Sequence, residues 1–583
     1  MKKTLLKSVL GLSIAMMASF AFAQEKATVT ILETSDIHGA IAPWDYATDT
    51  AADNGLAKVA TVIKQERQKD PTLLLVDCGD NLQDNLIQEF RNQKVTPMVG
   101  AMNLMNYDLH VLGNHEFNFE FKNLQKTLKT FKAPTIGANI YTKKNKRWLK
   151  PYLIKEVNGV KIALVGLTAP HIDQWEAADP SHFKGLHFTQ PVDEMETVLK
   201  ELEGKADAIM IVSHYGADGE YGSTGMEPIA EKYGDKIAAF FIGHAHSVIN
   251  KTASNGALIL EPGSKGSDVA KATFTFEKKD GKWVLTERKG EMLKVKGANV
   301  EPDAEILKFN EKTHEASRKI ANTPVGKVGA DFLPALYWNG IKGIPTAALQ
   351  DTAMIDLINK VQLETVKADV ACTALFDETS NLTKGDFRKR DGVKIYKYDN
   401  TLFGVKVTGK QLKAVMEEQA GNFFNQFVEG DVTISFNPSI RLYMYDMFQG
   451  VDYEIDISQS AGSRIKNVMY KGAPLKDDEQ LILAMNNYRY GGLAKAGLIS
   501  SSPDAVVYQS NDALRDIISA YIQKKGTIQP ECDNNWKITG YNFPPEAEKV
   551  YQMIREGKLS IPYSEDGRTP NIKSVNIKDV KLN

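Results

Sequence analysis

The chain has 583 residues, of which 43% are hydrophobic and 25% are charged, and its formal net charge is −2. This length exceeds what one hydrophobic core usually serves, so we expect two sizeable domains. The near-neutral charge argues against binding of nucleic-acid polymers through a basic surface, although it does not exclude single nucleotides.

The first 23 residues have the pattern of a secretory signal peptide. Lys2 and Lys3 precede a mostly apolar stretch that runs to Phe22, and Ala21 and Ala23 have the spacing of a cleavage site. An uncleaved membrane anchor is the alternative. No later run is long and apolar enough to cross a bilayer, so we expect a secreted mature chain without a membrane span.

The next part of the chain, residues 24–300, alternates apolar strand-like segments with amphipathic helix-like segments. Helical patterning is clearest in Leu56–Arg67 and Asp193–Leu202. The expected strands are Thr28–Leu32, Thr72–Val76, His110–Leu112, Lys161–Leu167, Ala208–Val212 and Ala238–Ile242. Continuous apolar strands separated by helices predict a layered α/β domain with a buried sheet.

The sequence changes character near residue 300. Pro302 opens a charged, helix-compatible run that continues to about Ala321, and Pro324 follows its end. We expect an interdomain linker helix over residues 301–323, with a helix packed on one of the domains as the alternative. Residues 324–583 predict a second, smaller α/β domain. Its expected strands include Leu402–Val407 and Leu481–Met485.

The chain has three cysteines, Cys78, Cys372 and Cys532. An odd number in an exported chain leaves at least one thiol without a partner in the same chain. Cys372 and Cys532 are candidates for a disulfide, and the sequence leaves that pairing open because it does not fix the distance between them.

Five polar motifs each follow a predicted strand. They are Asp36-Ile37-His38, Gly79-Asp80-Asn81, Gly113-Asn114-His115-Glu116, Ser213-His214 and Gly243-His244-Ala245-His246. Sites in open α/β sheets form beyond the carboxyl ends of the strands, so motifs placed there can converge. Each motif alone is weak, because Asp is common in turns and a single buried His is usually a hydrogen-bonded core residue. Their conjunction in this order indicates one metal site.

The residue types suit a dinuclear centre, because imidazole and carboxylate ligands together fit zinc, manganese, cobalt or iron. We predict two divalent metal ions held by Asp36, His38, Asp80, Asn114, His214, His244 and His246. Asp80 is the candidate for bridging both ions, because it has two oxygens and lies midway in the series. Two metals about 3.5–4 Å apart can share a nucleophilic water and stabilise in-line displacement at phosphorus.

These motifs resemble those of the calcineurin-like metallophosphoesterases, and nearly the whole mature chain is similar to their 5′-nucleotidase branch. The resemblance implies a four-layer αββα metallophosphoesterase domain, a linking helix and a smaller α/β nucleotide-recognition domain. It also implies that His115 is the catalytic residue, which stabilises charge on the transferring phosphoryl group. It assigns one metal to Asp36, His38, Asp80 and His246, and the other to Asp80, Asn114, His214 and His244.

Two positions depart from the 5′-nucleotidase pattern. The 5′-nucleotidases and UDP-sugar hydrolases carry Asp where this chain has Asn118, and the 5′-nucleotidases usually carry Gln where it has His246. Replacing a carboxylate by an amide removes a charge that favours an imidazolium, so we expect His115 to be less easily kept protonated. Both differences resemble the 2′,3′-cyclic-nucleotide 2′-phosphodiesterase/3′-nucleotidase branch, which is periplasmic in Gram-negative bacteria. We place Asn118 among the residues at the substrate.

Motifs in the second domain support the same branch. The matching segments are Tyr398-Asp399-Asn400-Thr401-Leu402, Asn486-Asn487-Tyr488-Arg489 and Asp533-Asn534-Asn535-Trp536. The match places Tyr398 and Tyr488 on either side of the base, where stacking contributes about 1–3 kcal/mol per base and tolerates any base. Ordinary packing is the alternative for each tyrosine.

The resemblance therefore implies hydrolysis of 2′,3′-cyclic nucleotides to 3′-nucleotides, and of 3′-nucleotides to nucleoside and phosphate. The alternatives are a 5′-nucleotidase or UDP-sugar hydrolase and a nonenzymatic nucleotide-binding surface protein. We expect nucleotides as the small-molecule partners, a periplasmic location and a rotation of the domains that closes the site. The sequence does not indicate an oligomeric state.

Overall fold

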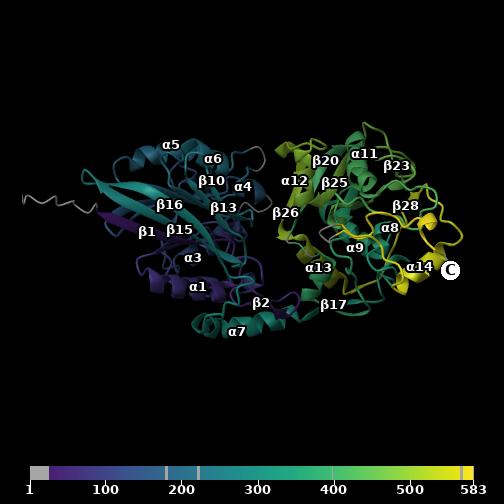
Figure 1. The fold of residues 1–583 in the computed structure, drawn as a ribbon, viewed down its shortest axis with the longest axis horizontal. Helices are drawn as coiled ribbons and strands as arrows, with labels where there is room; N and C mark the ends of the chain where they lie inside the picture. Colours follow the sequence, from purple (N-terminus) through teal and green to yellow (C-terminus); the bar gives the residue numbers. More distant parts are fainter. Residues whose placement is uncertain are drawn as a thin grey trace, which may run out of the picture.

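The computed structural model describes residues 25–176, 181–219, 223–396, 398, 400–564 and 569–581. The expected signal peptide therefore lies outside the described residues. Two groups of sheets lie side by side along the long axis of the molecule, and helix α7 (Ala304–Ala321) lies along the lower edge of the first group (Figure 1). Across the described part of the chain, every helix is too short or too polar to cross a bilayer.

The first domain contains two six-stranded sheets, with strand orders β16-β15-β1-β4-β5-β6 and β13-β14-β12-β11-β9-β8. The first comprises β1 (Lys26–Thr34), β4 (Leu74–Asp77), β5 (Leu109–Val111), β6 (Thr135–Ile136), β15 (Asp268–Lys279) and β16 (Lys282–Lys294). The second comprises β8 (Tyr152–Val157), β9 (Val160–Thr168), β11 (Ala208–His214), β12 (Ala239–Ile242), β13 (Val248–Thr252) and β14 (Leu258–Pro262). Each sheet has a parallel block, β1-β4-β5-β6 or β9-β11-β12-β14, whose carboxyl ends share one edge. All six strands predicted for this domain overlap strands of these blocks.

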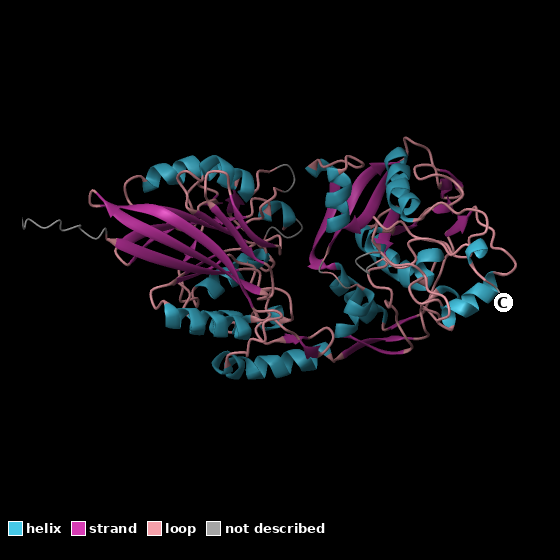
Figure 2. Cartoon of the chain, in the orientation of Figure 1, coloured by secondary structure: helices cyan, strands magenta, loops and turns pink. Residues whose placement is uncertain are grey.

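Hydrophobic packing arranges this domain in four layers. Val76 of the first sheet and Ile162 of the second share a core between the sheets. Leu75, on the opposite face of β4, packs with α1 (Leu56–Lys69) and α2 (Pro97–Met105). The outer face of the second sheet is covered by α5 (Pro191–Leu202) and α6 (Met226–Tyr233). Helices above and below the central strands are visible in Figure 2, and the predicted αββα arrangement is confirmed.

Helix α7 packs against the first domain. Its N-cap Asp303 accepts hydrogen bonds from the backbone N–H groups of Glu305 and Ile306, each at 3.2 Å. Ile306 is buried in the same core as α1 and α2. Lys64 of α1 donates to Asp303 at 2.7 Å. The helix therefore rests on the first domain and leads directly into β17 (Pro324–Val328), the first strand of the second domain.

The second domain is built around a five-stranded sheet of order β21-β18-β25-β20-β26. Its strands are β18 (Val370–Ala374), β20 (Thr401–Thr408), β21 (Asp446–Gln449), β25 (Gln480–Asn486) and β26 (Val506–Ala513), so both strands predicted here are confirmed. Helices α9 (Ala353–Val366) and α13 (Leu514–Lys525) pack on one face, and α11 (Gly409–Met416) and α12 (Asn487–Lys495) on the other.

Two smaller sheets flank the five-stranded sheet. One has the order β19-β17-β27, with β19 (Gly385–Arg388) and β27 (Thr527–Ile528) beside β17. The other has the order β24-β23-β22-β28, with bounds β22 (Asp452–Asp456), β23 (Ile465–Tyr470), β24 (Ala473–Pro474) and β28 (Trp536–Thr539). Cys372 is buried on β18 and Cys532 is exposed, and both are free thiols.

Ion pairs join the two domains. Arg515 of α13 lies 2.9 Å from Asp84, a residue of the loop that follows β4. Lys389 lies 2.6 Å from Glu89. Asp84 also pairs with Lys265 at 3.2 Å, so its carboxylate forms an ion pair with one cation from each domain.

Candidate metal centre and active site

The predicted metal ligands all lie at the carboxyl ends of parallel strands from the two packed sheets. The first sheet supplies residues after β1, β4 and β5, and the second sheet supplies the end of β11 and the loop after β12. These residues are Asp36, His38, Asp80 and Asn114 from the first sheet and His214, His244 and His246 from the second. Face-to-face packing of the sheets therefore brings all five motifs to one edge.

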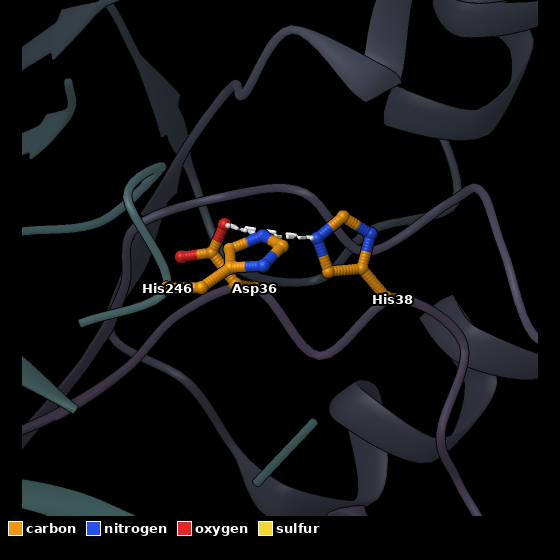
Figure 3. A group of neighbouring side chains, drawn as sticks. All are labelled: Asp36, His38 and His246. Atoms are coloured by element: carbon orange, nitrogen blue, oxygen red, sulfur yellow. Dashed lines mark hydrogen bonds and ion pairs between the residues drawn. The ribbon is translucent and has the colours of Figure 1, made fainter. Parts of the chain in front are cut away.

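Asp36, His38 and His246 form the first cluster of side chains. Asp36 Oδ1 lies 3.3 Å from His246 Nε2 and 3.7 Å from His38 Nε2. The two Nε2 atoms lie 2.9 Å apart. Figure 3 shows the fully buried carboxylate facing both rings. A carboxylate oxygen and two imidazole nitrogens directed at one another fit a divalent cation such as zinc or manganese.

Asp80, Asn114, His214 and His244 form the second cluster. His214 Nε2 lies 3.0 Å from Asp80 Oδ2 and 3.2 Å from Asn114 Oδ1. His244 Nδ1 lies 2.9 Å from the same Asn114 oxygen. Asp80 Oδ2 also lies 3.9 Å from His38 Nε2 of the first cluster. Asp80 is therefore placed between the two clusters, where a bridging ligand has to be.

The backbone around these ligands is strained and closely packed. Five of the predicted ligands have φ values between 48° and 81°, a region that costs a residue with a side chain about 1–3 kcal/mol. They are Asp36, His38, Asp80, His244 and His246. A Cβ atom on Gly113 would lie 2.1 Å from Asp80 Oδ1, so only glycine fits there. Such strain persists where surrounding contacts enforce it, and it is typical of functional sites.

Hydrogen bonds behind the predicted ligands fix their orientation. His214 Nδ1 donates to the backbone oxygen of Cys78 at 2.6 Å, which directs Nε2 towards Asp80. The buried carboxylate of Glu116 accepts from the backbone N–H groups of Asp80 at 2.9 Å and Gly113 at 2.6 Å. It also accepts from those of Asn81 and Leu82. Glu116 belongs to a motif that is visible in the sequence, but the sequence does not indicate its role.

The charges of the predicted ligands influence one another strongly. Burial, the largest single influence, would raise the pKa values of Asp36 and Asp80, but the charge on His214 together with the other neighbouring histidines holds both well below their usual range. Burial disfavours a charged His214, yet the carboxylates of Asp80 and Asp36 raise its pKa to about 10. The side chains thus hold two carboxylates and a protonated imidazole where the sequence predicts metals.

A chain of hydrogen bonds leads away from the predicted catalytic histidine. His115 Nδ1 lies 2.5 Å from Asn118 Oδ1, and Asn118 Nδ2 donates to Glu176 Oε1 at 2.8 Å. Glu176 Oε2 in turn lies 2.5 Å from His182 Nδ1. On the other side, His115 Nε2 lies 3.9 Å from Asp80 Oδ2. His115 and Asn118 were predicted from the sequence. Glu176 was not, and His182 has no ligand-like neighbours in the sequence.

A cleft of about 480 Å³ between the domains contains this centre. His115, Asn118 and Glu176 line it on one side, and Tyr398 and Arg515 line it on the other. The Tyr398 side chain is 38% exposed, and its ring makes edge contacts with the rings of Phe376 and Tyr443. Tyr488 is 58% exposed, near the start of α12, directly after Asn487, another lining residue. The structure therefore brings Tyr398 into the cleft and leaves Tyr488 more open to solvent.

Comparison with known proteins gives two family matches. Residues 29–248 match the calcineurin-like phosphoesterase family, and residues 339–496 match the 5′-nucleotidase C-terminal domain. The first match includes all seven predicted metal ligands, and the second includes both predicted base-stacking tyrosines.

Similar proteins support these matches over most of the chain. A 2′,3′-cyclic-nucleotide 2′-phosphodiesterase/3′-nucleotidase of Haemophilus influenzae is 29% identical over 605 residues, which cover 89% of this chain and 90% of that protein. The trifunctional nucleotide phosphoesterase protein YfkN of Bacillus subtilis is 28% identical over 96% of this chain, which spans only 43% of YfkN. The structure of Haemophilus influenzae NAD nucleotidase has a TM-score of 0.58 at 18% identity, over 89% of this chain and 100% of that one, and shares the fold.

Proposed function

The chain is a calcineurin-like phosphoesterase joined to a 5′-nucleotidase C-terminal domain, and we propose that it hydrolyses 2′,3′-cyclic nucleotides to 3′-nucleotides, and 3′-nucleotides to nucleoside and phosphate. The observation that carries the proposal is one cleft with Asp and His clusters on one wall and Tyr398 on the other. The name and coverage of the Haemophilus influenzae relative favour these substrates over 5′-nucleotides or UDP-sugars.

The chain would hold two divalent metal ions, of zinc, manganese, cobalt or iron. We assign one to Asp36, His38, Asp80 and His246, and the other to Asp80, Asn114, His214 and His244. The fit rests on the donor atoms: within the Asp36-His38-His246 and Asp80-His214-His244 groups, ring nitrogens and carboxylate oxygens all lie within 4.8 Å of one another. When bound, two such ions supply Lewis acidity and an activated water for displacement at phosphorus.

His115 is the proposed catalytic residue. Asn118 engages its Nδ1, so Nε2 is the nitrogen directed towards Asp80 and the metal clusters. From there, the Nε2–H of the protonated ring can donate a hydrogen bond to a phosphoryl oxygen as negative charge develops on it, or a proton to the leaving oxygen. Both reactions break a P–O bond and differ in the oxygen that leaves, so the same residues can serve both.

Tyr398 and Tyr488 are the proposed base platform. Both rings are partly exposed, and Tyr398 lies on the wall of the cleft opposite the metal clusters. A substrate with its phosphate at the metals and its base on the tyrosines would contact both domains. Rotation of the domains would then adjust the distance between the two sites, with Asp84–Arg515 as an ion pair that changes.

The proposal also includes cellular location and domain limits. Residues 1–23 would direct export, and the mature chain would act in the periplasm. We keep residues 24–300 as the catalytic domain, 301–323 as the linker and 324–583 as the nucleotide-binding domain. The expected ligands of the mature protein are mononucleotides rather than nucleic-acid polymers.

Metal removal and replacement tests the proposal. We expect chelation to abolish phosphate release from 3′-AMP, added Mn²⁺ or Co²⁺ to restore it, and elemental analysis to find two ions per restored chain. Asp80→Asn should retain less metal and lose activity under all of these conditions. Full activity after verified metal removal would contradict the proposal, and nucleotide binding without hydrolysis in restored protein would favour a nonenzymatic binding protein.

A further inference from the structure

We propose that Glu176 is a positioning residue for His115, and that it acts through the side-chain amide of Asn118. The inference rests on the proposed function, because it takes His115 as the group that works on the phosphoryl oxygens. The observation behind it is the unbroken series of contacts from His115 Nδ1 to Asn118 Oδ1 and from Asn118 Nδ2 to Glu176 Oε1, at 2.5 and 2.8 Å.

The chemistry of an amide makes its orientation decisive. The Asn118 side chain has a donor end and an acceptor end of almost the same shape, so local contacts must determine which end faces His115. An ionised Glu176 only accepts hydrogen bonds, and it therefore requires the NH₂ end of Asn118. The carbonyl end is then left for His115, and it requires a proton on Nδ1.

Together, these hydrogen bonds determine which ring nitrogen of His115 carries the proton. With Nδ1 donating to Asn118, the neutral ring leaves its Nε2 lone pair towards the metal clusters, and the protonated ring directs Nε2–H there. With the amide reversed, its NH₂ would donate to an unprotonated Nδ1, and the neutral ring would carry its proton on Nε2 instead. Glu176 thus selects the tautomer of a residue that it does not touch.

The surroundings of Glu176 suit this role. Its side chain is 4% exposed. Glu176 comes directly after α4 (Ile172–Trp175), whose Ile172 is anchored in the core of the first domain. His182 Nδ1 lies 2.5 Å from Glu176 Oε2, which leaves Oε1 to Asn118. Burial raises the pKa of Glu176, and the hydrogen bond from His182 opposes that shift, so His182 favours the acceptor-only form.

The arrangement also explains how the chain functions without a carboxylate at position 118. An Asp there has two acceptor oxygens and orients an Nδ1–H with no further help. Asn118 has only one acceptor end, so it needs a partner that determines the direction of the amide. Glu176 is that partner, supplied by a segment 58 positions away in the sequence.

Kinetics of single variants provide the first test. Glu176→Ala in the metal-restored protein should lower kcat by about 10- to 100-fold, the usual effect of losing such a supporting hydrogen bond, with KM and metal content unchanged. Glu176→Gln should recover much of the loss, because its amide oxygen can still accept from Asn118. Glu203→Gln, at an exposed carboxylate, is the matched control and should behave as the wild type.

Comparing the effect of Glu176→Ala in the wild type with its effect in Asn118→Asp distinguishes a positioning role from a merely structural one. In Asn118→Asp, Glu176→Ala should produce no further fall in kcat, because an aspartate at 118 has no donor end to misdirect. Equal losses in the two backgrounds would overturn the inference, and so would an unchanged kcat in Glu176→Ala. Thermal unfolding of each variant identifies any that are misfolded, and in that case Glu176→Leu, which fills most of the same space but has no acceptor oxygen, is compared in both backgrounds.

Assays on two substrates distinguish a failure of this inference from a failure of the proposed function. Each variant is assayed on 3′-AMP and on bis(p-nitrophenyl) phosphate, a phosphodiester without a nucleoside. If the wild type cleaves only the second compound, the nucleotide assignment fails while the kcat pattern on that compound still decides the role of Glu176. If the metal-restored wild type cleaves neither, both proposals are overturned.

Discussion

The carboxylate of Glu116 accepts a hydrogen bond of 2.9 Å from the backbone N–H of Asp80. The same oxygen accepts from Gly113 at 2.6 Å, so one side chain joins the loop after β4 to the loop after β5. Asp80 and Asn114 are presented by these two loops. The spacing between these two proposed metal ligands therefore depends on a residue that binds no metal itself.

Glu116→Gln should loosen both loops. In the wild type, these backbone N–H groups donate to the carboxylate of Glu116. In the variant, the glutamine NH₂ would face some of them instead of an acceptor, and each buried donor left unsatisfied costs about 1–3 kcal/mol. We expect a lower Tm and a lower metal content after dialysis, measured by calorimetry and elemental analysis. Glu156→Gln, at an exposed strand position, is the control. Wild-type values for both quantities in Glu116→Gln would show that the four hydrogen bonds are dispensable.

Metal binding should release protons. His214 has a pKa of about 10 in the metal-free protein, so it is protonated at neutral pH, and its Nε2 must lose that proton to bind a cation. Apparent metal affinity should therefore rise with pH up to about that value and fall as the pH is lowered. Titration calorimetry in buffers of different ionisation enthalpy measures the released protons. A binding enthalpy independent of the buffer would contradict the assignment of His214.

Asp356→Asn should stabilise the protein at alkaline pH. Burial and the neighbouring charge of Asp351 raise the pKa of Asp356 to about 8. Its unfolded pKa is about 4. Because the folded value is the higher one, the wild type loses stability as pH rises from about 4 to about 8, and the loss is complete above that. Asparagine cannot ionise, and its NH₂ can donate to Asp351.

The measurement is Tm for wild type and Asp356→Asn at pH 5 and pH 9. The variant should gain most relative to wild type at pH 9 and least at pH 5. Asp452→Asn, at an exposed position of β22, should show no such pH dependence. A Tm difference that is the same at both pH values would show that Asp356 does not titrate in this range.

Tyr398→Ala should weaken binding of nucleotides more than catalysis. Loss of one stacking ring costs about 1–3 kcal/mol, and the change should be in KM, because the base lies away from the reacting phosphate. Tyr398→Phe keeps the ring and should stay close to wild type. Tyr541→Ala removes an exposed tyrosine that is absent from the cleft lining and is the control. A fall in kcat at unchanged KM would place Tyr398 outside base recognition.

The sequence was sufficient to predict the strands that precede the predicted ligand motifs of the first domain. Strands β4 and β11 are buried on both faces, so they read as continuous apolar runs, and each ends at a predicted ligand motif. The strand ends give the positions of the motifs, and the chemistry of Asp and His gives the predicted metal. These signals are local, which is why they could be read before the fold was known.

Contacts between segments that are distant in the sequence could not be predicted from local sequence patterns. Glu176 reaches Asn118 across 58 positions, and Arg515 reaches Asp84 across 431. Neither residue belongs to a recognised motif, because its role depends on which loops become neighbours after the sheets pack. Glu116 is an intermediate case: its position within a motif was visible, but the backbone groups that it binds belong partly to another loop.

The central claim is tested most directly by the substrate preference of one metal-restored preparation. Values of kcat/KM should be measured for 2′,3′-cAMP, 3′-AMP, 5′-AMP and a UDP-sugar under the same conditions. We predict that 2′,3′-cAMP and 3′-AMP are both hydrolysed with much higher kcat/KM than 5′-AMP or the UDP-sugar. A preference for 5′-AMP or the UDP-sugar would contradict the claim and identify the protein as a 5′-nucleotidase or UDP-sugar hydrolase.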